Sequence, residues 1–308
     1  MSKNSQSNES QDNNEKHWIK VPEYDQRLDI HQKREYKVVK ANEIIQRAKY
    51  ELDNTELKIM TYIFSMIKPT DEIGKVYSFS IQEFCQVCGL NASSGKHYQT
   101  IKAKLKKIRD KSFWLVEENG SSTTVGWLNT VTITPQSGVI KVKLQDELSK
   151  YVVGLLGGSY TQYELISTLP MKSAYSIRMY ELLKSYAYQH KPVILDVDVL
   201  KGQIFATHYK NFKDFRVKVI EKAVKEINLY SDLEVVQWEP VSKGRKVIQI
   251  KFIIREKPSK DRLFSYIKAH EELDKNQVEG QMSLADYVNT PEDVTIELID
   301  DTKKPPIE

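Results

Sequence analysis

Basic side chains gather in three short stretches of this sequence, and they are the residues best suited to chemistry with a charged partner. The first stretch runs from Lys96 to Lys111 and holds seven basic residues against one acid, Asp110. Each cation that neutralises a nucleic-acid phosphate releases condensed counterions, which favours binding. The stretch therefore indicates phosphate contact, although a lysine-rich helix face that meets only water is the alternative reading.

The second and third stretches are shorter, and each lies at one particular point of an expected element: the start of a helix and the tip of a hairpin. Lys210, Lys213 and Arg216 lie at the start of an expected helix, the part of a recognition helix that reaches base edges. The run from Ser242 to Lys246 forms a basic hairpin tip, which suits contact with an adjacent groove or phosphate run. The candidate DNA-contacting residues are Lys96, Lys102, Lys106, Lys107, Lys210, Lys213, Arg216, Lys218, Lys222, Lys243, Arg245 and Lys246.

Charge is unevenly distributed along the chain. The formal net charge is +4, but residues 36–257 carry 34 Lys and Arg against 23 Asp and Glu. A basic excess concentrated in the expected folded part is typical of a protein that binds a polyanion. Because 37 of the 46 basic residues are Lys, the bias of an AT-rich genome is the alternative explanation.

Other arrangements that could carry chemistry are incomplete. Cys85 and Cys88 form a Cys-x-x-Cys pair near His97, but structural zinc needs four ligands and no second such pair occurs, so we expect both cysteines to pack in the core. The run from Gly89 to Lys96 has one residue too many between its glycines for a phosphate-binding loop. No spacing of acid, base and nucleophile is recognisable, so we expect no enzymatic activity, no metal and no cofactor.

The elements that must position the basic residues occur twice in one order: helix, strand, short helix, tight turn, basic helix and hairpin. The three matched pairs begin near Asn54 and Met171, Val76 and Val193, and Tyr98 and Phe212, at offsets of 117, 117 and 114 residues. This is the order of a winged helix, so the sequence predicts an α+β fold with two tandem winged-helix domains.

Local signals place the individual elements. Asp53 and Glu56 fit a capping box at the start of the first repeated helix. Apolar residues line one face of each basic helix. We predict helices at 42–49, 54–67, 81–88, 98–111, 146–152, 171–188, 199–205 and 212–229, and strands at 36–39, 76–80, 113–117, 123–134, 139–144, 193–197, 233–238 and 246–254.

Composition sets the expected domain boundaries. Residues 1–35 are predicted to be a disordered tail, 36–152 the first winged helix, 153–257 the second, and 258–308 an acidic, largely flexible tail with a short helical segment near 263–269. Gly154, Gly157 and Gly158 indicate a flexible connection between the domains. No signal peptide or membrane span is recognisable, so we expect a soluble, cytoplasmic protein.

Several runs resemble the plasmid replication initiators of the tandem winged-helix, iteron-binding family. They are VKANEII at 39–45, LDNTELKI at 52–59, SAYSIRMYELL at 173–183, and the segment 212–228 followed by Asp232-Leu233 and the basic hairpin. Together they cover roughly residues 36–257. Residues 258–308 do not match that pattern.

The resemblance implies an initiator that binds double-stranded DNA with direct repeats at a plasmid origin. It further implies that the protein helps to melt AT-rich DNA, recruits the host replication initiator and replicative helicase, and forms a homodimer that represses its own promoter. In that family the second winged helix supplies most base contacts, and the first supplies phosphate contacts and takes part in dimerisation. By position, Lys213, Arg216 and Lys218 would lie in the principal reading helix and Lys243 to Lys246 in its wing.

Two other functions share parts of this description. A winged-helix transcriptional repressor without a replication role would have the same DNA surface. A nicking enzyme of rolling-circle replication would need a nucleophilic tyrosine and a metal site, often a His-x-His pair, and the six histidines are far apart in the sequence.

Overall fold

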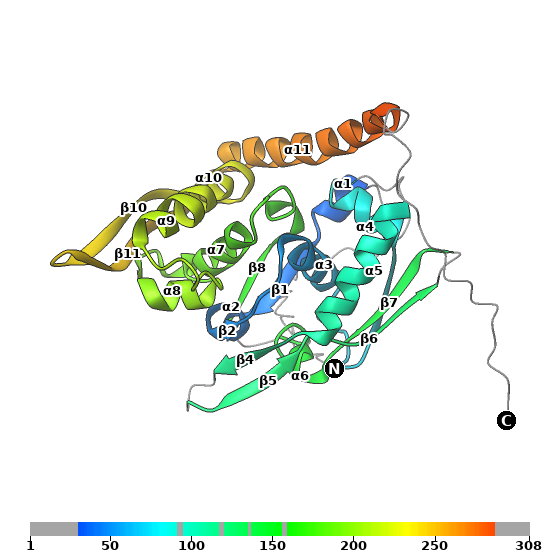
Figure 1. The fold of residues 1–308 in the computed structure, drawn as a ribbon, viewed down its shortest axis with the longest axis horizontal. Helices are drawn as coiled ribbons and strands as arrows, with labels where there is room; N and C mark the ends of the chain where they lie inside the picture. Colours follow the sequence, from blue (N-terminus) through cyan, green and yellow to red (C-terminus); the bar gives the residue numbers. More distant parts are fainter. Residues whose placement is uncertain (1–29, 91–94, 117–119, 135–136, 156–158, 287–308) are drawn as a thin grey trace, which may run out of the picture.

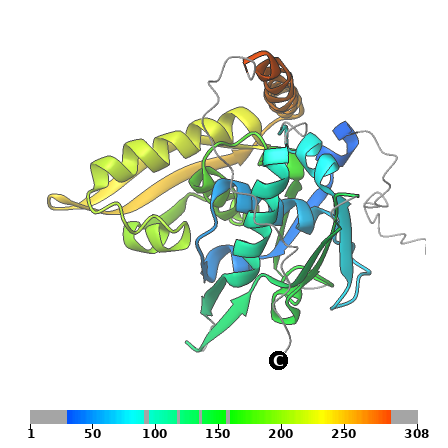
Figure 2. The same cartoon turned by 45° about the vertical axis from the view of Figure 1, so that its right-hand side comes forward.

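Two units of similar topology lie side by side in the computed structural model, and one long helix runs across them (Figures 1 and 2). The structure describes residues 30–90, 95–116, 120–134, 137–155 and 159–286. Within these residues, no helix is long and apolar enough to cross a membrane.

The first unit contains three helices and a three-stranded antiparallel sheet. Its elements are α3 (Asn54–Ser65), β3 (Val76–Ser80), α4 (Ile81–Val87), α5 (Gly95–Asp110), β6 (Leu128–Thr134) and β7 (Val139–Leu144). In the sheet, β7 pairs with both β3 and β6. The first strand of the unit therefore pairs with its last strand, as in a winged helix.

The second unit repeats this arrangement. Its elements are α7 (Ala174–Lys184), β9 (Val193–Asp196), α8 (Val197–Gln203), α9 (Phe212–Phe215), the π-helical turn η3 (Arg216–Ile220), α10 (Glu221–Tyr230), β10 (Leu233–Lys243) and β11 (Lys246–Glu256). Here β11 pairs with β9 and β10, again antiparallel. The prediction of two tandem winged helices is confirmed.

The capping box predicted at the start of α3 is present. The Asp53 side chain accepts a hydrogen bond from the Glu56 backbone N–H at 3.0 Å, and the Glu56 carboxylate accepts one from the Asp53 N–H at 3.0 Å. These bonds satisfy two backbone donors that have no partner inside the helix. Apolar residues of α3 then fill the core of the first unit.

Further elements surround the first unit. They are α1 (Ile30–Arg34), β1 (Lys37–Ala41), α2 (Asn42–Arg47), β2 (Ala48–Lys49), β4 (Ser112–Val116), β5 (Ser122–Gly126), α6 (Asp146–Ser149), β8 (Tyr160–Glu164) and the 3-10 turn η1 (Leu165–Ser167). Strands β2, β4 and β5 form a second sheet. The run 123–134, predicted as one β segment, is two strands, β5 and β6, which are separated by a bend at the buried Trp127.

Strand β8 was not predicted. It pairs with β1 in an antiparallel two-stranded sheet that aligns Lys37 with Glu164. The chain beyond residue 152 therefore returns to the first unit before α7 begins, and the boundary at residues 152 and 153 stays a prediction. Of the three glycines in the expected flexible connection, Gly157 and Gly158 lie outside the described residues.

The two tails also differ from expectation within the described residues. Helix α11 (Ser259–Asp286) contains the short helical segment predicted near 263–269 and extends beyond it at both ends, into the segment that we predicted to be largely flexible. Ala269 and Leu273 are buried, which gives the helix an apolar contact face. At the other end, α1 is helical and Arg34 is fully buried, although both belong to the segment predicted as a disordered tail; residues 1–29 lie outside the described residues.

A buried charged network joins the two units. Glu181 on α7 accepts hydrogen bonds from Lys40 Nζ and Tyr163 Oη, both at 2.5 Å, and lies 3.6 Å from Arg178. Burial alone would raise the pKa of Glu181, but Lys40 and Arg178 lower it below its usual value. The guanidinium of Arg178 also stacks on Tyr50, 3.9 Å from the ring centre. The carboxylate is therefore ionised and shared between the units.

Candidate nucleic-acid interface

In the second unit α9, η3 and α10 follow one another as one helix, the candidate reading helix, which begins after the capping residue Asn211. Asn211 accepts a hydrogen bond from the Asp214 backbone N–H at 2.7 Å, which fixes the first turn of α9. Phe215, Val219 and Ala223 are buried, while Lys213 is exposed. The helix therefore packs one face on its own unit and turns its basic face outward.

The middle of this helix is a π-helical turn, which we did not predict. Its buried residues Phe215, Val219, Ala223 and Ile227 are spaced four apart, and in a regular α-helix each such step overshoots a full turn by about 40°. The wider turn at η3 absorbs part of this drift. The repeated spacing of four was the sequence signal that could have revealed it.

As a result, three consecutive residues face outward in the middle of the helix: Arg216, Val217 and Lys218. Arg216 lies 3.3 Å from Glu221, and Lys218 lies 3.9 Å from Asp214. All four charged side chains are substantially exposed, and exposed ion pairs contribute little stability. Both cations can exchange these partners for a phosphate or a base edge at small cost.

The remaining candidates near this helix are also accessible. Lys210, Lys213 and Lys222 are exposed, and among the described residues no carboxylate lies within ion-pair distance of them. The predicted candidates of the second unit therefore gather along one reading helix and the turn before it.

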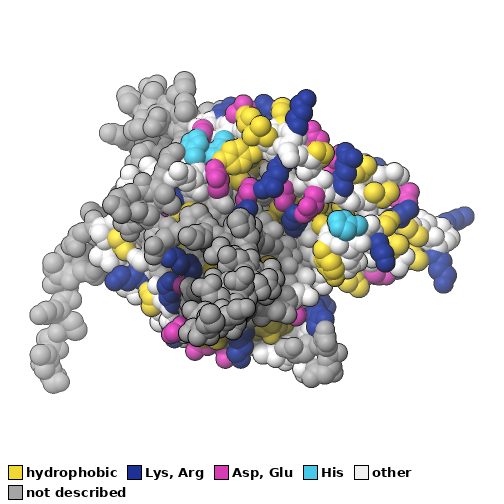
Figure 3. Space-filling model, turned by 180° about the vertical axis from the view of Figure 1, so that it is seen from behind, with side chains coloured by type: hydrophobic (Ala, Val, Ile, Leu, Met, Phe, Trp, Pro, Cys, Tyr) yellow, Lys and Arg dark blue, Asp and Glu magenta, His cyan; other side chains and the backbone are white. Residues whose placement is uncertain are grey.

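The wing is the β10–β11 hairpin, which projects from the body of the protein (Figure 1). Gly244 has φ +62° at its tip, a conformation that glycine adopts without steric cost. Lys243, Arg245 and Lys246 are all exposed around it. Figure 3 shows basic side chains at the end of this hairpin.

One side chain fixes the wing to the reading helix. Asn228 on α10 donates to the carbonyl of Val235 at 3.0 Å and accepts from the Val235 N–H at 2.7 Å. This pair of bonds holds the base of β10 against α10. Wing and helix thereby form one continuous exposed surface.

In the first unit, the basic residues of α5 divide into two groups. Lys104 forms an ion pair with Asp53, and Lys111 forms one with Glu56 at 2.6 Å. These two lysines bind the start of α3 and are poor candidates for DNA contact. This division could not be predicted from neighbouring residues, because the carboxylates that bind the two lysines lie more than 50 residues away in the chain.

The other group on α5 faces outward. Lys102, Lys106 and Lys107 are exposed, and Lys102, Lys106 and Arg109 line a groove of about 270 Å³ beside β6. Lys96 lies in the first turn of α5, but its side chain is outside the described residues. The first unit thus has an outward row of cations in the described part of α5.

Cys85 and Cys88 are buried free thiols in the core of the first unit, as predicted. Burial raises the pKa of Cys85 to about 11 and that of Cys88 to about 12. A protonated buried thiol is a poor nucleophile and a poor metal ligand. The side chain of His97, the third residue considered with them, lies outside the described residues.

A cavity of about 720 Å³ lies between the two units. It is lined by Asp53 and Lys107 from the first unit and by Arg178, Phe205 and His208 from the second. Phe205 has φ +57°, a left-handed conformation that is unusual for a bulky side chain. Acidic and basic side chains both reach the cavity, so it has no single charge that would select a ligand.

Two winged helices in tandem, each with an outward basic helix, define the class of this protein as a tandem winged-helix protein. The model of a family described as "Initiator Replication protein, WH1" matches residues 37–184, and that of "Initiator Rep protein, WH2" matches residues 196–254. Together the two matches cover about two thirds of the chain. The chain therefore belongs to the Rep3 family of plasmid replication initiators.

A solved structure has the same fold. It is the crystal structure of the Pi initiator protein in complex with iteron DNA, with a TM-score of 0.62 and 19% sequence identity. The match covers 73% of this chain and 99% of that chain. Helices α1 and α11 lie outside the residues that the two family models match.

Proposed function

We propose that this protein initiates plasmid replication by binding direct repeats in double-stranded origin DNA, with its two winged helices doing unequal work. The observation that carries the proposal is the difference between the two basic helices. The second unit exposes its cations at a capped helix start and on a wing bonded to that helix. The first unit ties two of its α5 lysines to its own α3.

In this proposal the second unit reads sequence. Lys213, Arg216 and Lys218 reach base edges in the major groove, where Arg and Lys recognise guanine. Lys210 and Lys222 flank them and contact phosphate. The wing residues Lys243, Arg245 and Lys246 follow the neighbouring groove or backbone.

The first unit supplies affinity more than discrimination. Lys96, Lys102, Lys106 and Lys107 lie along α5 and would each neutralise a phosphate. The fold shared with the Pi initiator protein, which was solved with iteron DNA, supports a repeat as the target. Phosphate contacts fix the position of a protein on the duplex, and base contacts choose the sequence.

The proposed role is non-enzymatic and depends on binding free energy. Initiators bound side by side on several repeats would deform the duplex and favour opening of an adjacent AT-rich stretch. Recruitment of the host initiator and replicative helicase, homodimer formation and repression of its own promoter belong to the same proposal, on the strength of the family membership.

The test is an Arg216→Ala, Lys218→Ala variant assayed for binding to a repeat array and for maintenance of a plasmid that lacks any other origin. We expect loss of sequence-specific binding and loss of the plasmid. The matched control is Lys150→Ala, Lys260→Ala, which removes the same charge from exposed positions on other elements. Normal replication by the Arg216→Ala, Lys218→Ala variant would show that the reading residues are wrongly assigned.

A further inference from the structure

Helix α11 crosses from one winged helix to the other. It begins directly after β11 of the second unit and passes along the top of the molecule to α1 and α4 of the first (Figures 1 and 2). At 28 residues it is the longest helix among those described. Its polar connections to the other described residues include three that lie at different points along its length.

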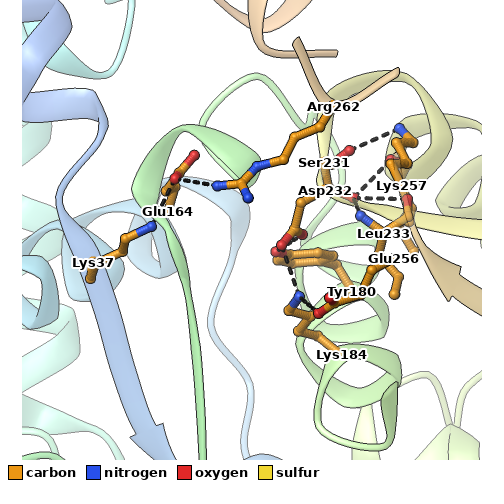
Figure 4. Close-up of polar contacts among 11 residues, drawn as sticks. Lys37, Glu164, Tyr180, Lys184, Ser231, Asp232, Leu233, Glu256, Lys257 and Arg262 are labelled. Carbon is orange, nitrogen blue, oxygen red and sulfur yellow. Dashed lines mark hydrogen bonds and ion pairs between the residues drawn. The ribbon is translucent and has the colours of Figure 1, made fainter. Parts of the chain in front are cut away.

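The first place is the end of the reading helix. Lys257, just before α11, donates to the carbonyl of Ser231 at 2.8 Å (Figure 4). It also donates to the carbonyl of Asn228 at 2.6 Å and to Ser265 Oγ at 2.7 Å. The two carbonyls lie at the C-terminal end of α10, where a cation is favoured. Movement of the start of α11 would therefore pull directly on the reading helix.

The second place is the two-stranded sheet of β1 and β8. Arg262 on α11 lies 2.6 Å from Glu164 on β8, and Glu164 also binds Lys37 on β1 at 2.7 Å (Figure 4). Leu165 to Ser167, which follow β8, are fully buried in this region. One carboxylate thus joins the helix to both strands.

The third place is a latch around Arg34, whose side chain is fully buried. It donates to Asp274 on α11 at 2.7 Å, contacts His270 Nδ1 at 3.2 Å, and donates to the carbonyl of Val87 at the end of α4 at 2.9 Å. Close by, Gly89 packs against the backbone of Leu273 so tightly that a Cβ would lie 2.7 Å from the Leu273 oxygen. This end of α11 is therefore held by the first winged helix.

The same latch brings together His31, His270 and Asp274, three groups with metal-ligand atoms within 4.8 Å of one another. A guanidinium already supplies positive charge there, because Arg34 bonds both His270 and Asp274. The rings of His31 and His270 are stacked, with centres 4.6 Å apart. The cluster serves to dock α11 on α1.

The units have a second connection on the other side of the molecule. Arg178 on α7 donates to the carbonyl of Ala48 on β2 at 3.3 Å, and Gln203 on α8 donates to the carbonyl of Gln46 on α2 at 2.7 Å. These elements lie away from α11 in Figure 1. Two units joined along one side can swing about that side. Two units joined on both sides cannot change their angle without breaking one connection.

We propose that α11 is a positioning element that fixes the angle and distance between helix α5 and the α9–α10 reading helix. It thereby sets the spacing of DNA contacts that the protein accepts. The inference rests on the proposed function in one respect only: both helices must contact one duplex. A rigid pair of binding modules accepts a narrow range of spacings, whereas a flexibly joined pair tolerates many.

The test compares the wild-type chain with an Arg262→Ala, Asp274→Asn variant, and with the milder Arg262→Ala variant. Nitroxide labels at Ala103→Cys on α5 and Lys225→Cys on α10, both exposed, report the distance between the helices without DNA. Binding is then measured on repeats that carry one to five extra base pairs between the segments protected by each unit. Five base pairs are about half a helical turn.

We expect a narrow distance distribution in the wild type and a broader one in the double variant. We also expect a preference of about tenfold or more for the natural spacing, which the double variant reduces to about twofold. The control Lys268→Ala, Glu271→Ala removes an exposed ion pair from the same helix and should behave as wild type. Melting curves establish that each variant is folded.

Unchanged label distances in the double variant, or an unchanged spacing preference despite broader distances, would overturn the role of α11. If the wild-type chain bound no repeat DNA, the proposed function would fail. The label distances would still decide whether α11 fixes the distance between α5 and the α9–α10 helix.

Discussion

The α5 helix of the first winged helix and the α9–α10 helix of the second occupy equivalent places in one topology, yet they present their charges differently. On α5, Lys104 and Lys111 are bound by carboxylates at the start of α3. On the second helix and in the turn just before it, Lys213 and Lys210 have no such partner among the described residues. The number of basic residues on a helix therefore says less about DNA contact than the position of the nearest acids.

The two hairpins differ as well. Strands β10 and β11 have 11 residues each, whereas β6 and β7 have seven and six. Asn228 bonds the longer hairpin to its helix through both backbone groups of Val235. A long wing fixed to its reading helix suits a unit that must place side chains on particular bases.

The largest effect should come from the network that the two units share. Glu181→Gln removes the carboxylate between Lys40 and Arg178, and leaves two buried cations without it. We expect a loss of about 3–5 kcal/mol in the free energy of unfolding, the usual cost of breaking a buried ion pair. Urea denaturation followed by both tryptophan fluorescence and circular dichroism measures it.

This variant also tests whether the two units are separate copies or one cooperative body. If they share a core through Glu181, the urea midpoints measured by tryptophan fluorescence and by circular dichroism should fall by the same amount. The control Glu221→Gln breaks an exposed pair with Arg216 and should change stability by less than about 1 kcal/mol. Equal effects of the two substitutions would argue against the network.

A smaller effect should separate the DNA roles of the two helices. Lys102→Ala, Lys106→Ala on α5 should weaken binding to all sequences alike, and should flatten the slope of log affinity against log salt by about one unit for each lost phosphate contact. Arg216→Ala on the reading helix should cost about 1–3 kcal/mol on the correct repeat only. Titrations with repeat and scrambled duplexes at several salt concentrations measure both.

The matched control for the α5 variant is Lys104→Ala, because that lysine lies on the same helix but is bound by Asp53 at the start of α3. It should leave the salt slope unchanged. If loss of the α5 lysines changed sequence preference and loss of Arg216 did not, the assignment of roles to the two units would be reversed.

The smallest effect concerns the cap of α3. Asp53→Ala removes both the cap and the partner of Lys104 and should cost about 1 kcal/mol, whereas Asp53→Asn keeps a capping oxygen and should cost a few tenths. Partial burial tends to raise the pKa of Asp53, but Lys104 and the Glu56 backbone N–H stabilise the charged carboxylate and lower this pKa below its usual value. The stability that its charge adds is therefore present at neutral pH and is lost as the pH falls through the folded-state pKa.

Thermal melts of both variants at neutral and acidic pH check this prediction. The comparison with the second unit is Asn211→Ala, which removes the cap of the reading helix and should also cost about 1 kcal/mol. An Asp53→Asn variant as unstable as Asp53→Ala would mean that the ion pair, rather than the cap, stabilises this corner.

Much of the fold was predictable because its signals are local. The capping box at Asp53 and the strand at Val76–Ser80 follow from residue types close together in the chain. Strand β8 gave no such signal, because its sequence is polar and its partner β1 lies more than 100 residues earlier. Helix α11 was underestimated because few of its residues are apolar and buried.

The candidate DNA residues were chosen from charge and position, and their roles stay predictions. Their accessibility could be anticipated for the hairpin tip, where Gly244 forces a turn. It could not be anticipated for Lys104 and Lys111, since the acids that bind them come from another helix. The π-helical turn was visible in principle as a repeated spacing of four between buried residues.

That π-helical turn has a practical consequence for engineering. Residues 212–215 and 221–230 are out of phase relative to an ordinary helix, because the turn between them is wider. The reading surface cannot be transplanted onto a regular helix residue for residue. Deleting one residue within Arg216–Ile220 should convert the turn to α-helix and leave the later side chains close to their present directions, because a wider turn with one more residue covers about the same rotation as an α-helical turn.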